Sequence, residues 1–364
     1  MHILLLILGL VLLTVGGEFL IRGASRLAVA IGISPLVIGL TVVAYGTSMP
    51  ELAVSAVAGL RGASDIAVAN VVGSNIFNVL FILGACAVIL PLTVSRQLVR
   101  RDVPLMIGAS VVVTLMVQDG HLRQLEGCVL ALSAAGYTVY SIWAGRKEHA
   151  AVYDEYAAEA ATPPGTRNSA AQLAGQVGLI LIGLVLLVLG SRWLVDGAVI
   201  IARAMGISEA VIGLTIIAAG TSLPEVATSI MATIRGQRDI AIGNVVGSNL
   251  FNLLAILGVA GVITPGGLTV SPGMVRFDVP IMLGVAAICL PVCYSGLRIS
   301  RLEGATLFVG YLAYLVALVF TATGRDPENS LKKLILYAGV LVFSLCLSVA
   351  VRSWHLNRTG RAAA

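Results

Sequence analysis

Long apolar runs separated by short polar segments dominate this chain. Runs such as Val177–Leu189 with its flanks and Leu334–Val351 reach the roughly 20 residues that a helix needs to cross a bilayer. Because the runs are continuous rather than alternating, they favour helices over the strands of a membrane barrel. Eleven spans are predicted, near residues 3–21, 34–60, 66–91, 102–118, 124–144, 173–195, 208–234, 240–263, 277–294, 301–322 and 333–353.

Composition agrees with this pattern and excludes a soluble enzyme. Of the 364 residues, 58% are hydrophobic and 11% are charged. The net charge of +5 does not indicate nucleic-acid binding, because the basic residues stand between apolar runs, where lipid headgroups and topology explain them. The expected partners are therefore the lipid bilayer and inorganic cations, with no nucleic acid and no protein partner implied. The five cysteines lie inside apolar runs and form no CxxC pair, so neither a disulfide framework nor a cofactor is expected.

The two halves of the chain resemble each other at an offset of 174 residues. Residues 38–84 and 212–258 share 30 identities in 47 aligned pairs. Five predicted helices fall in each half, and an odd number forces the second copy through the membrane in the opposite direction. We therefore predict an all-α membrane protein with two inverted repeats of five helices, at 1–145 and 173–322. A linker at 146–172 joins them, and an extra helix with a tail follows at 323–364.

Orientation follows from the distribution of basic residues. With the N-terminus outside, 15 of the 23 Lys and Arg residues face the cytoplasm and eight face outward. Cytoplasmic loops carry the excess of Lys and Arg in membrane proteins. The sequence thus predicts an outside N-terminus and a cytoplasmic linker in a multi-pass protein of the bacterial inner membrane.

The repeated segments keep polar residues that packing alone does not require. Glu51 and Glu225 fall in mid-span, where an ionised carboxylate is costly without a partner. The basic residues within ten positions, Arg61 and Arg235, fall at helix ends. A mobile cation is the missing partner that this pattern indicates, although a structural acid paired with a basic side chain is the alternative.

Residues around each glutamate fit such a cation site. Thr47 and Ser48 precede Glu51 by four and three positions and share its helical face, and Thr221 and Ser222 precede Glu225 in the same way. The prolines at 50 and 224 obstruct the carbonyls of the glycines at 46 and 220, so each helix is expected to break there. Freed carbonyls, hydroxyls and carboxylates form an all-oxygen set that suits hard cations such as Ca²⁺ or alkali ions.

A second polar cluster, NVVGSNIFN at 70–78 and NVVGSNLFN at 244–252, follows each glutamate. Ser74 and Asn78 share a face four residues apart, as do Ser248 and Asn252. Their oxygens are candidates to complete the cation cage. Small polar residues also join transmembrane helices, which is the structural alternative for these four.

The paired motifs GTSMPE/GSNIFN and GTSLPE/GSNLFN resemble the two signature repeats of the cation/Ca²⁺ exchanger superfamily, specifically its prokaryotic sodium/calcium exchanger branch. The resemblance implies a ten-helix transporter, not an enzyme, that exchanges Na⁺ for Ca²⁺ at a mid-membrane site and exports Ca²⁺. It also implies backbone ligands at Ala44 and Ala218 beside the ten side chains named above. Many relatives carry Asp where this chain has Asn252, which leaves two carboxylates and argues against the potassium-dependent branch. A proton/calcium exchanger and a passive cation channel are the alternative functions.

Overall fold

The computed structural model describes residues 2–159, 170–322, 344 and 348–349, and there the chain is almost entirely helical. The first repeat contains α1 (His2–Ile31), α2 (Pro35–Ile38), η1 (Gly39–Val43), α3 (Ala44–Thr47), α4 (Met49–Leu60), α5 (Ser64–Phe77), η2 (Asn78–Leu83), α6 (Gly84–Ile89), η3 (Leu98–Asp102), α7 (Val103–Met116), η4 (Val117–Asp119) and α8 (Gln124–Glu159). The predicted all-α membrane class is confirmed for this part of the chain.

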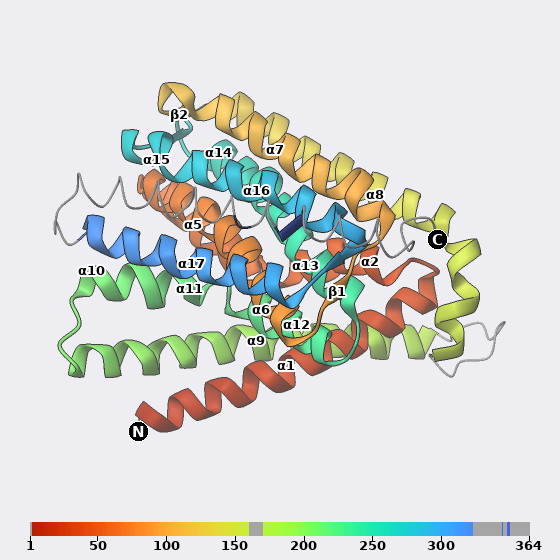
Figure 1. Ribbon diagram of the computed structural model, residues 1–364. Helices are drawn as coiled ribbons and strands as arrows, with labels where there is room; N and C mark the ends of the chain where they lie inside the picture. The colour runs from red at the N-terminus through yellow and green to blue at the C-terminus, as the bar shows by residue number, and fades with distance from the viewer. Residues whose placement is uncertain (1, 160–169, 323–343, 345–347, 350–364) are drawn as a thin grey trace.

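The second repeat has the same order of elements, except that the α-helix α15 (Pro272–Arg276) stands where the first repeat has the π-helical η3. It contains α9 (Ala170–Ala204), α10 (Glu209–Ile212), η5 (Gly213–Ile217), α11 (Ala218–Gly220), α12 (Leu223–Ile234), α13 (Arg238–Phe251), η6 (Asn252–Ile256), α14 (Leu257–Ile263), α15 (Pro272–Arg276), α16 (Asp278–Tyr294), η7 (Ser295–Leu297) and α17 (Arg301–Ala322). Figure 1 shows α1 and α9 along one edge of the molecule and α7 and α8 along the opposite edge.

Eight helices in the described residues are long and apolar enough to cross a membrane. A ninth span is the pair Pro35–Thr47 and Met49–Leu60, which is bent by 47°. The span predicted near 208–234 is divided among the short helices α10, α11 and α12. The predicted helix at 333–353 falls almost entirely outside the described residues. Each repeat therefore contains one interrupted helix, and the interruptions occupy equivalent positions.

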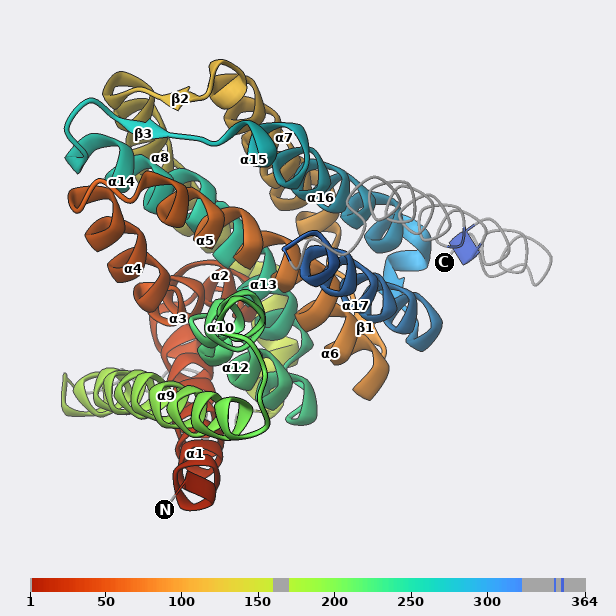
Figure 2. The ribbon, with the colours of Figure 1, turned by 90° about the vertical axis from the view of Figure 1, so that its left-hand side faces the viewer.

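Two of the spans form the centre of the bundle. In Ser64–Ile89 and Arg238–Ile263, 72% and 78% of the most apolar window is buried, against 28% in α1 and 22% in α9. Figure 2 places α5 and α13 in the middle of the molecule, with the broken helices beside them. A helix buried on most of its faces has to satisfy its polar side chains within the protein. The polar residues of α5 and α13 are therefore expected to bond to one another or to bind a ligand.

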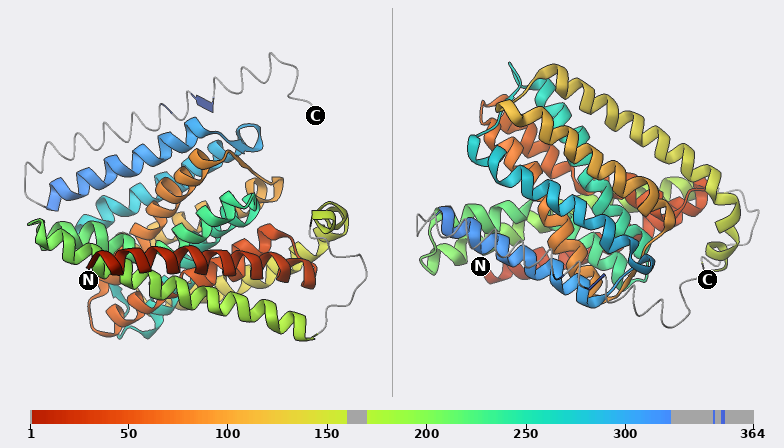
Figure 3. Two further views of the ribbon diagram at one scale, coloured as in Figure 1. Left: turned by 90° about the horizontal axis from the view of Figure 1, so that it is seen from below. Right: turned by 45° about the horizontal axis from the view of Figure 1, so that its top comes forward.

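The edge helices α1 and α9 pack against each other through glycine. A Cβ atom added at Gly183 would lie 2.7 Å from the backbone nitrogen of Leu20, and one added at Gly9 would lie 2.7 Å from that of Leu194. Figure 3 shows the two helices side by side. Small residues allow transmembrane helices to approach this closely. In lipid, where no hydrophobic driving force joins helices, the van der Waals packing gained by close approach stabilises the pair. The two edge helices thus form one tightly packed pair.

Two short strand pairs connect the repeats. Strand β1 (Leu92–Thr93) pairs with β4 (Arg298–Ile299), and β2 (His121–Leu122) pairs with β3 (Leu268–Thr269), both antiparallel. Each pair joins a loop of one repeat to a loop of the other, which fixes the repeats to each other at two places.

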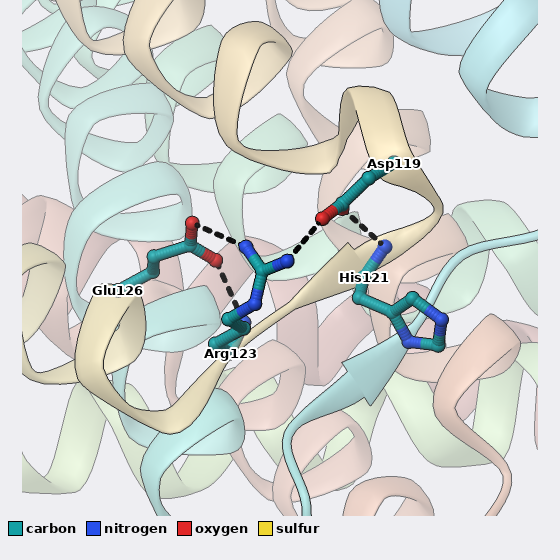
Figure 4. Close-up of polar contacts among 4 residues, drawn as sticks. All are labelled: Asp119, His121, Arg123 and Glu126. Atoms are coloured by element: carbon teal, nitrogen blue, oxygen red, sulfur yellow. Dashed lines mark hydrogen bonds and ion pairs between the residues drawn. The ribbon is translucent and has the colours of Figure 1, made fainter.

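The loop around β2 is held by local charges. Arg123 donates to Asp119 at 2.5 Å, while its backbone N–H donates to Glu126 at 2.7 Å, as Figure 4 shows. The backbone N–H of His121 also donates to Asp119, at 3.1 Å. The Arg123 and Asp119 side chains are 63% and 43% exposed, so these contacts order a surface loop and add little to stability.

Candidate functional site

Both broken helices are interrupted at a serine. Ser48 separates α3 from α4 with φ −84° and ψ 10°, and Ser222 precedes α12 with φ −89° and ψ 5°. The following prolines occupy the first turn of the new helix, where the missing N–H costs nothing. The predicted breaks are confirmed, two residues beyond the expected glycines. The carbonyl of Gly220 accepts a hydrogen bond of 2.7 Å from Ser191, so it is already engaged within the protein.

The two glutamates lie in the first turn after each break. Glu51 is 1% exposed and Glu225 is 2% exposed. The start of a helix favours negative charge, because its backbone N–H groups are unpaired and the helix dipole is positive there. Each glutamate also accepts from the serine of the opposite repeat: Ser222 donates to Glu51 Oε1 at 2.8 Å, and Ser48 donates to Glu225 Oε1 at 2.7 Å. Hydrogen bonds thus join the GTSMPE motif of one repeat to the GTSLPE motif of the other.

The threonines make the same exchange between repeats. Thr47 lies 3.2 Å from the amide oxygen of Asn244, and Thr221 lies 3.3 Å from that of Asn70. The Asn70 amide nitrogen donates to the backbone oxygen of Glu51 at 3.2 Å, and Asn244 reaches that of Glu225 at 3.5 Å. These asparagines hold the backbone that carries each glutamate.

The sequence pattern assigned no role to Asn70 and Asn244, although they begin the two segments of the second polar cluster. Each also donates to a buried serine, Asn70 to Ser55 at 3.0 Å and Asn244 to Ser229 at 2.9 Å. The available signal was their spacing, since Asn70 precedes Ser74 by four residues and therefore shares its helical face.

The second polar cluster supplies further oxygens. Ser74 lies 3.1 Å from the hydroxyl of Ser222, which places it beside the Glu51 carboxylate. Asn78 and Asn252 are each 1% exposed and begin the π-helical turns η2 and η6. Ser248 is fully buried, and its hydroxyl has no hydrogen-bond partner among the described residues.

The two alanines predicted as backbone ligands differ in their surroundings. Ala44 is fully buried, and its carbonyl accepts from the Ser48 N–H at 3.1 Å and from the Thr47 hydroxyl at 3.3 Å. Ala218, its equivalent, begins α11 and is exposed. The structure therefore places these two positions in unlike environments, and their role as ligands stays a prediction.

Four π-helical turns occur at equivalent positions of the repeats, and sequence reasoning did not predict them. Two precede the breaks, at Gly39–Val43 and Gly213–Ile217, and two follow the asparagines, at Asn78–Leu83 and Asn252–Ile256. Such turns alter the regular hydrogen bonding of a helix and are frequent at functional sites. Their repetition marks the backbone around the centre as specialised in both halves.

The unpaired atoms of this centre are oxygens. In the described residues, no donor reaches Glu51 Oε2, Glu225 Oε2, Asn78 Oδ1 or Asn252 Oδ1, and all four are buried. Buried acceptors without a donor are costly, but they are the ligands that a hard cation requires. The described residues contain no group of three or more His, Cys, Asp or Glu side chains suited to a metal, so the charge of the centre comes from its two glutamates. This donor set fits Ca²⁺ or Na⁺ and lacks the thiols and imidazoles that soft metals prefer.

An inverted-repeat helical bundle with buried oxygen atoms that lack donors at its centre is the architecture of a membrane transporter of cations. The family model "Sodium/calcium exchanger protein" matches residues 1–143 and 175–320, which is most of the chain. The chain therefore belongs to the sodium/calcium exchanger family and is a cation exchanger rather than an enzyme.

Individual relatives agree with this assignment. The chain is 39% identical over 314 residues to the putative antiporter CaxA of Alkalimonas amylolytica, covering 85% of this chain and 95% of that protein. It is 32% identical over 347 residues to the sodium/calcium exchanger MaX1 of Methanosarcina acetivorans, covering 88% and 99%. A structure of the sodium-calcium exchanger NCX_Mj is similar with a TM-score of 0.73 at 26% identity, covering 89% of this chain and 99% of that one.

Proposed function

We propose that this protein is a sodium/calcium antiporter that carries both ions through the buried centre by alternating access. The proposal rests on one observation above all: two buried glutamates, one from each inverted repeat, each have a carboxylate oxygen that no donor among the described residues satisfies. The two sites of charge are equivalent, cross-linked by Ser48 and Ser222, and surrounded by neutral oxygens. The relatives described as sodium/calcium exchangers support the choice of ions.

Charge balance explains how such a centre couples the two fluxes. Two carboxylates neutralise one Ca²⁺, whereas several Na⁺ ions in its place leave an excess of positive charge. An ion-free centre would hold two uncompensated charges in a low-dielectric bundle, which is strongly unfavourable. The transition between outward and inward states therefore proceeds with ions bound, and one kind of ion replaces the other. We propose that Na⁺ enters the cell while Ca²⁺ leaves it.

Transport measurements separate this function from its alternatives. Purified protein is reconstituted into vesicles loaded with Ca²⁺, and efflux is followed after adding Na⁺ or after a pH step. Efflux triggered by Na⁺ is expected. Efflux triggered by pH alone would identify a proton/calcium exchanger, and leak without any trigger would identify a channel. Vesicles containing Glu51→Gln provide the control for flux that does not pass through the centre.

The orientation is a separate proposal that rests on the excess of basic residues on one side. We place the N-terminus outside and residues 146–172 in the cytoplasm of a bacterium, in its inner membrane. In a variant without native cysteines, Arg61→Cys is expected to react with impermeant thiol reagents from outside, and Gly165→Cys only from the cytoplasm. Reaction of both from the same side would contradict the inverted arrangement.

A further inference from the structure

Two buried amides near the centre have no part in the function proposed so far. Asn75 is 3% exposed and Asn249 is 2% exposed, and each lies between the serine and the asparagine of its own cluster. A buried polar side chain has to be hydrogen-bonded or it destabilises the fold. Their partners therefore indicate what these two residues are for.

Each of these amides is oriented by a backbone carbonyl of the other repeat. The Asn75 amide nitrogen donates to the backbone oxygen of Asn249, and the Asn249 amide nitrogen donates to that of Asn75, both at 3.4 Å. A carbonyl oxygen only accepts, so it selects the NH₂ end of the amide. The NH₂ groups also point toward sulfur, Asn75 to Met282 at 3.8 Å and Asn249 to Met106 at 3.5 Å. The amide oxygen of each side chain consequently points the other way.

Those oxygens in turn orient the next pair of amides. The Asn252 nitrogen donates to Asn75 Oδ1 at 3.0 Å, and the Asn78 nitrogen donates to Asn249 Oδ1 at 3.0 Å. With their NH₂ groups engaged, Asn78 and Asn252 keep their own amide oxygens free of any donor in the described residues. The two ends of an amide are nearly equal in shape but opposite in polarity, so without this constraint either end fits the same space.

We propose that Asn75 and Asn249 are positioning residues for cation binding, which set the Asn252 and Asn78 amides so that oxygen and not NH₂ faces the ion. This inference rests on the proposed function, because it requires that the centre binds cations. It assigns the pairs across the repeats: Asn75 acts on Asn252, and Asn249 acts on Asn78. The centre then keeps the two negative charges of its glutamates, while its neutral amide ligands present oxygen to the ion.

The test is a double-mutant cycle on the full-length protein, read as equilibrium binding of ⁴⁵Ca²⁺ with Na⁺ as competitor. Asn75→Leu removes the acceptor and is expected to weaken Ca²⁺ binding about tenfold, the usual scale for losing one hydrogen bond in a charged site. In the Asn252→Asp background the same substitution is expected to cost less than about twofold, because a carboxylate presents oxygen in either orientation.

The matched control introduces the same negative charge at Asn78, which is the partner of Asn249 and not of Asn75. In the Asn78→Asp background, Asn75→Leu should retain its full cost, since the Asn75 side chain accepts from Asn252, and the Asn78 side chain donates to Asn249 instead. The backbone bond from the Asn78 N–H to the Asn75 carbonyl is the same in both variants. Equal suppression by both aspartates, or suppression by neither, would overturn the positioning role, and so would unchanged binding in Asn75→Leu. Asn75→Ala serves the same comparison if the leucine variant does not give monodisperse protein.

Failure of the proposed function gives a different result. In that case the parent protein binds no Ca²⁺ that Glu51→Gln abolishes, or Na⁺ does not compete for that binding, whatever residue stands at position 75. Parent binding that requires Glu51 but ignores the Asn75 substitutions would leave the antiporter intact and remove the positioning role alone.

Discussion

Gly73 on α5 and Gly247 on α13 occupy equivalent positions, but their surroundings are opposite. A Cβ atom at Gly247 would lie 2.5 Å from the backbone oxygen of Leu40, whereas nothing lies within 4 Å of one at Gly73. The facing glycines differ in the same way: a Cβ at Gly39 would lie 2.9 Å from the Ile240 oxygen, and one at Gly213 meets open space. The segment η1 of the first broken helix is therefore packed against α13, while the equivalent segment η5 makes no comparable contact with α5 in the described residues.

Exposure of the broken helices agrees with this separation. Val43 and Ala44 are fully buried, whereas their equivalents Ile217 and Ala218 are exposed, Ile217 by 50%. Because the two segments have similar sequences, their different packing reflects conformation and not residue type. The comparison indicates a closed side, where η1 packs against α13, and an open side, where η5 does not pack against α5. Exchanging these two packings would open the opposite side, as inverted repeats allow.

The edge helices show a matching asymmetry. Helix α1 packs along α12, and no comparable contact joins α9 to α4 in the described residues. Glu18 of α1 accepts two bonds from Arg235 at the end of α12, at 2.7 and 2.8 Å. The equivalents of these residues in the other repeat are Arg192 and Arg61, two like charges. An ion pair thus joins the closed side, and its counterpart cannot form on the open side.

The largest expected effects test the equivalence of the repeats at the centre. Glu51→Gln and Glu225→Gln should each abolish sodium-driven Ca²⁺ flux, because either leaves one negative charge for a divalent ion. Measured in vesicles, the two losses are expected to be equal. Glu209→Gln is the control, since that acid forms an exposed ion pair with Arg203 and its loss should leave flux unchanged. Robust flux in one glutamine variant would break the equivalence.

The next effect concerns the open side. Gly73→Ala fits the described state, but its Cβ would obstruct closure of η5 onto α5, since overpacking costs about 1–3 kcal/mol. We expect exchange to fall about tenfold or more while equilibrium Ca²⁺ binding is retained. Gly247→Ala should act oppositely and favour opening of the other side.

Thiol labelling distinguishes these two outcomes. In a cysteine-free background, Ala218→Cys should react with an impermeant reagent and its equivalent Ala44→Cys should not. Adding Gly247→Ala is expected to reverse that order. If Ala44→Cys and Ala218→Cys react equally in the parent, the two sides do not differ as described.

An intermediate effect separates the two serines. Ser222 contacts both Glu51 and Ser74, whereas Ser48 contacts Glu225. Hydrogen bonds to charged groups contribute about 1.5–3 kcal/mol, so each alanine substitution should weaken Ca²⁺ binding by roughly tenfold or more. Ser222→Ala is expected to have the larger effect in calorimetric titrations. A larger effect of Ser48→Ala would argue that Ser74 is no part of the centre.

The smallest effect tests the ion pair on the closed side. Glu18→Gln should shift the population toward the opposite state by about two- to fivefold, the range of a partly exposed ion pair. The measurement is the labelling rate of Ala218→Cys, which should fall. Arg192→Glu, which permits an ion pair with Arg61 in the opposite state, should lower that rate further. An unchanged rate in both variants would remove any role for these charges.

The sequence predicted the features of this molecule that follow from local residue types and from the pattern of apolar runs. The breaks follow from Pro50 and Pro224, the inverted repeat from counting apolar runs, and the burial of Glu51 and Glu225 from their mid-span positions. The proline and glutamate signals lie within a few residues of the features that they predict, and the repeat is visible in the sequence itself.

Features that depend on contacts between the repeats could not be predicted in the same way. The sequence pattern assigned no role to Asn75 and Asn249, because their partners are 177 and 171 residues away in the chain. The different packing of Gly73 and Gly247 has no counterpart in sequence at all, because both are glycine in nearly identical segments. The π-helical turns also depend on tertiary packing.

The reciprocal bonds between Ser48 and Glu225, and between Ser222 and Glu51, have a consequence for ancestry. Neither repeat contains a complete centre, since each carboxylate needs a hydroxyl from the other half. A single repeat encoded alone would have to insert into the membrane in both directions and form an antiparallel dimer with a second copy of itself. Duplication and fusion of such a gene frees the two copies to differ at the faces, as Glu18 and Arg192 do. A change at the centre still has to remain compatible with the other half, which accounts for identity concentrated in these segments.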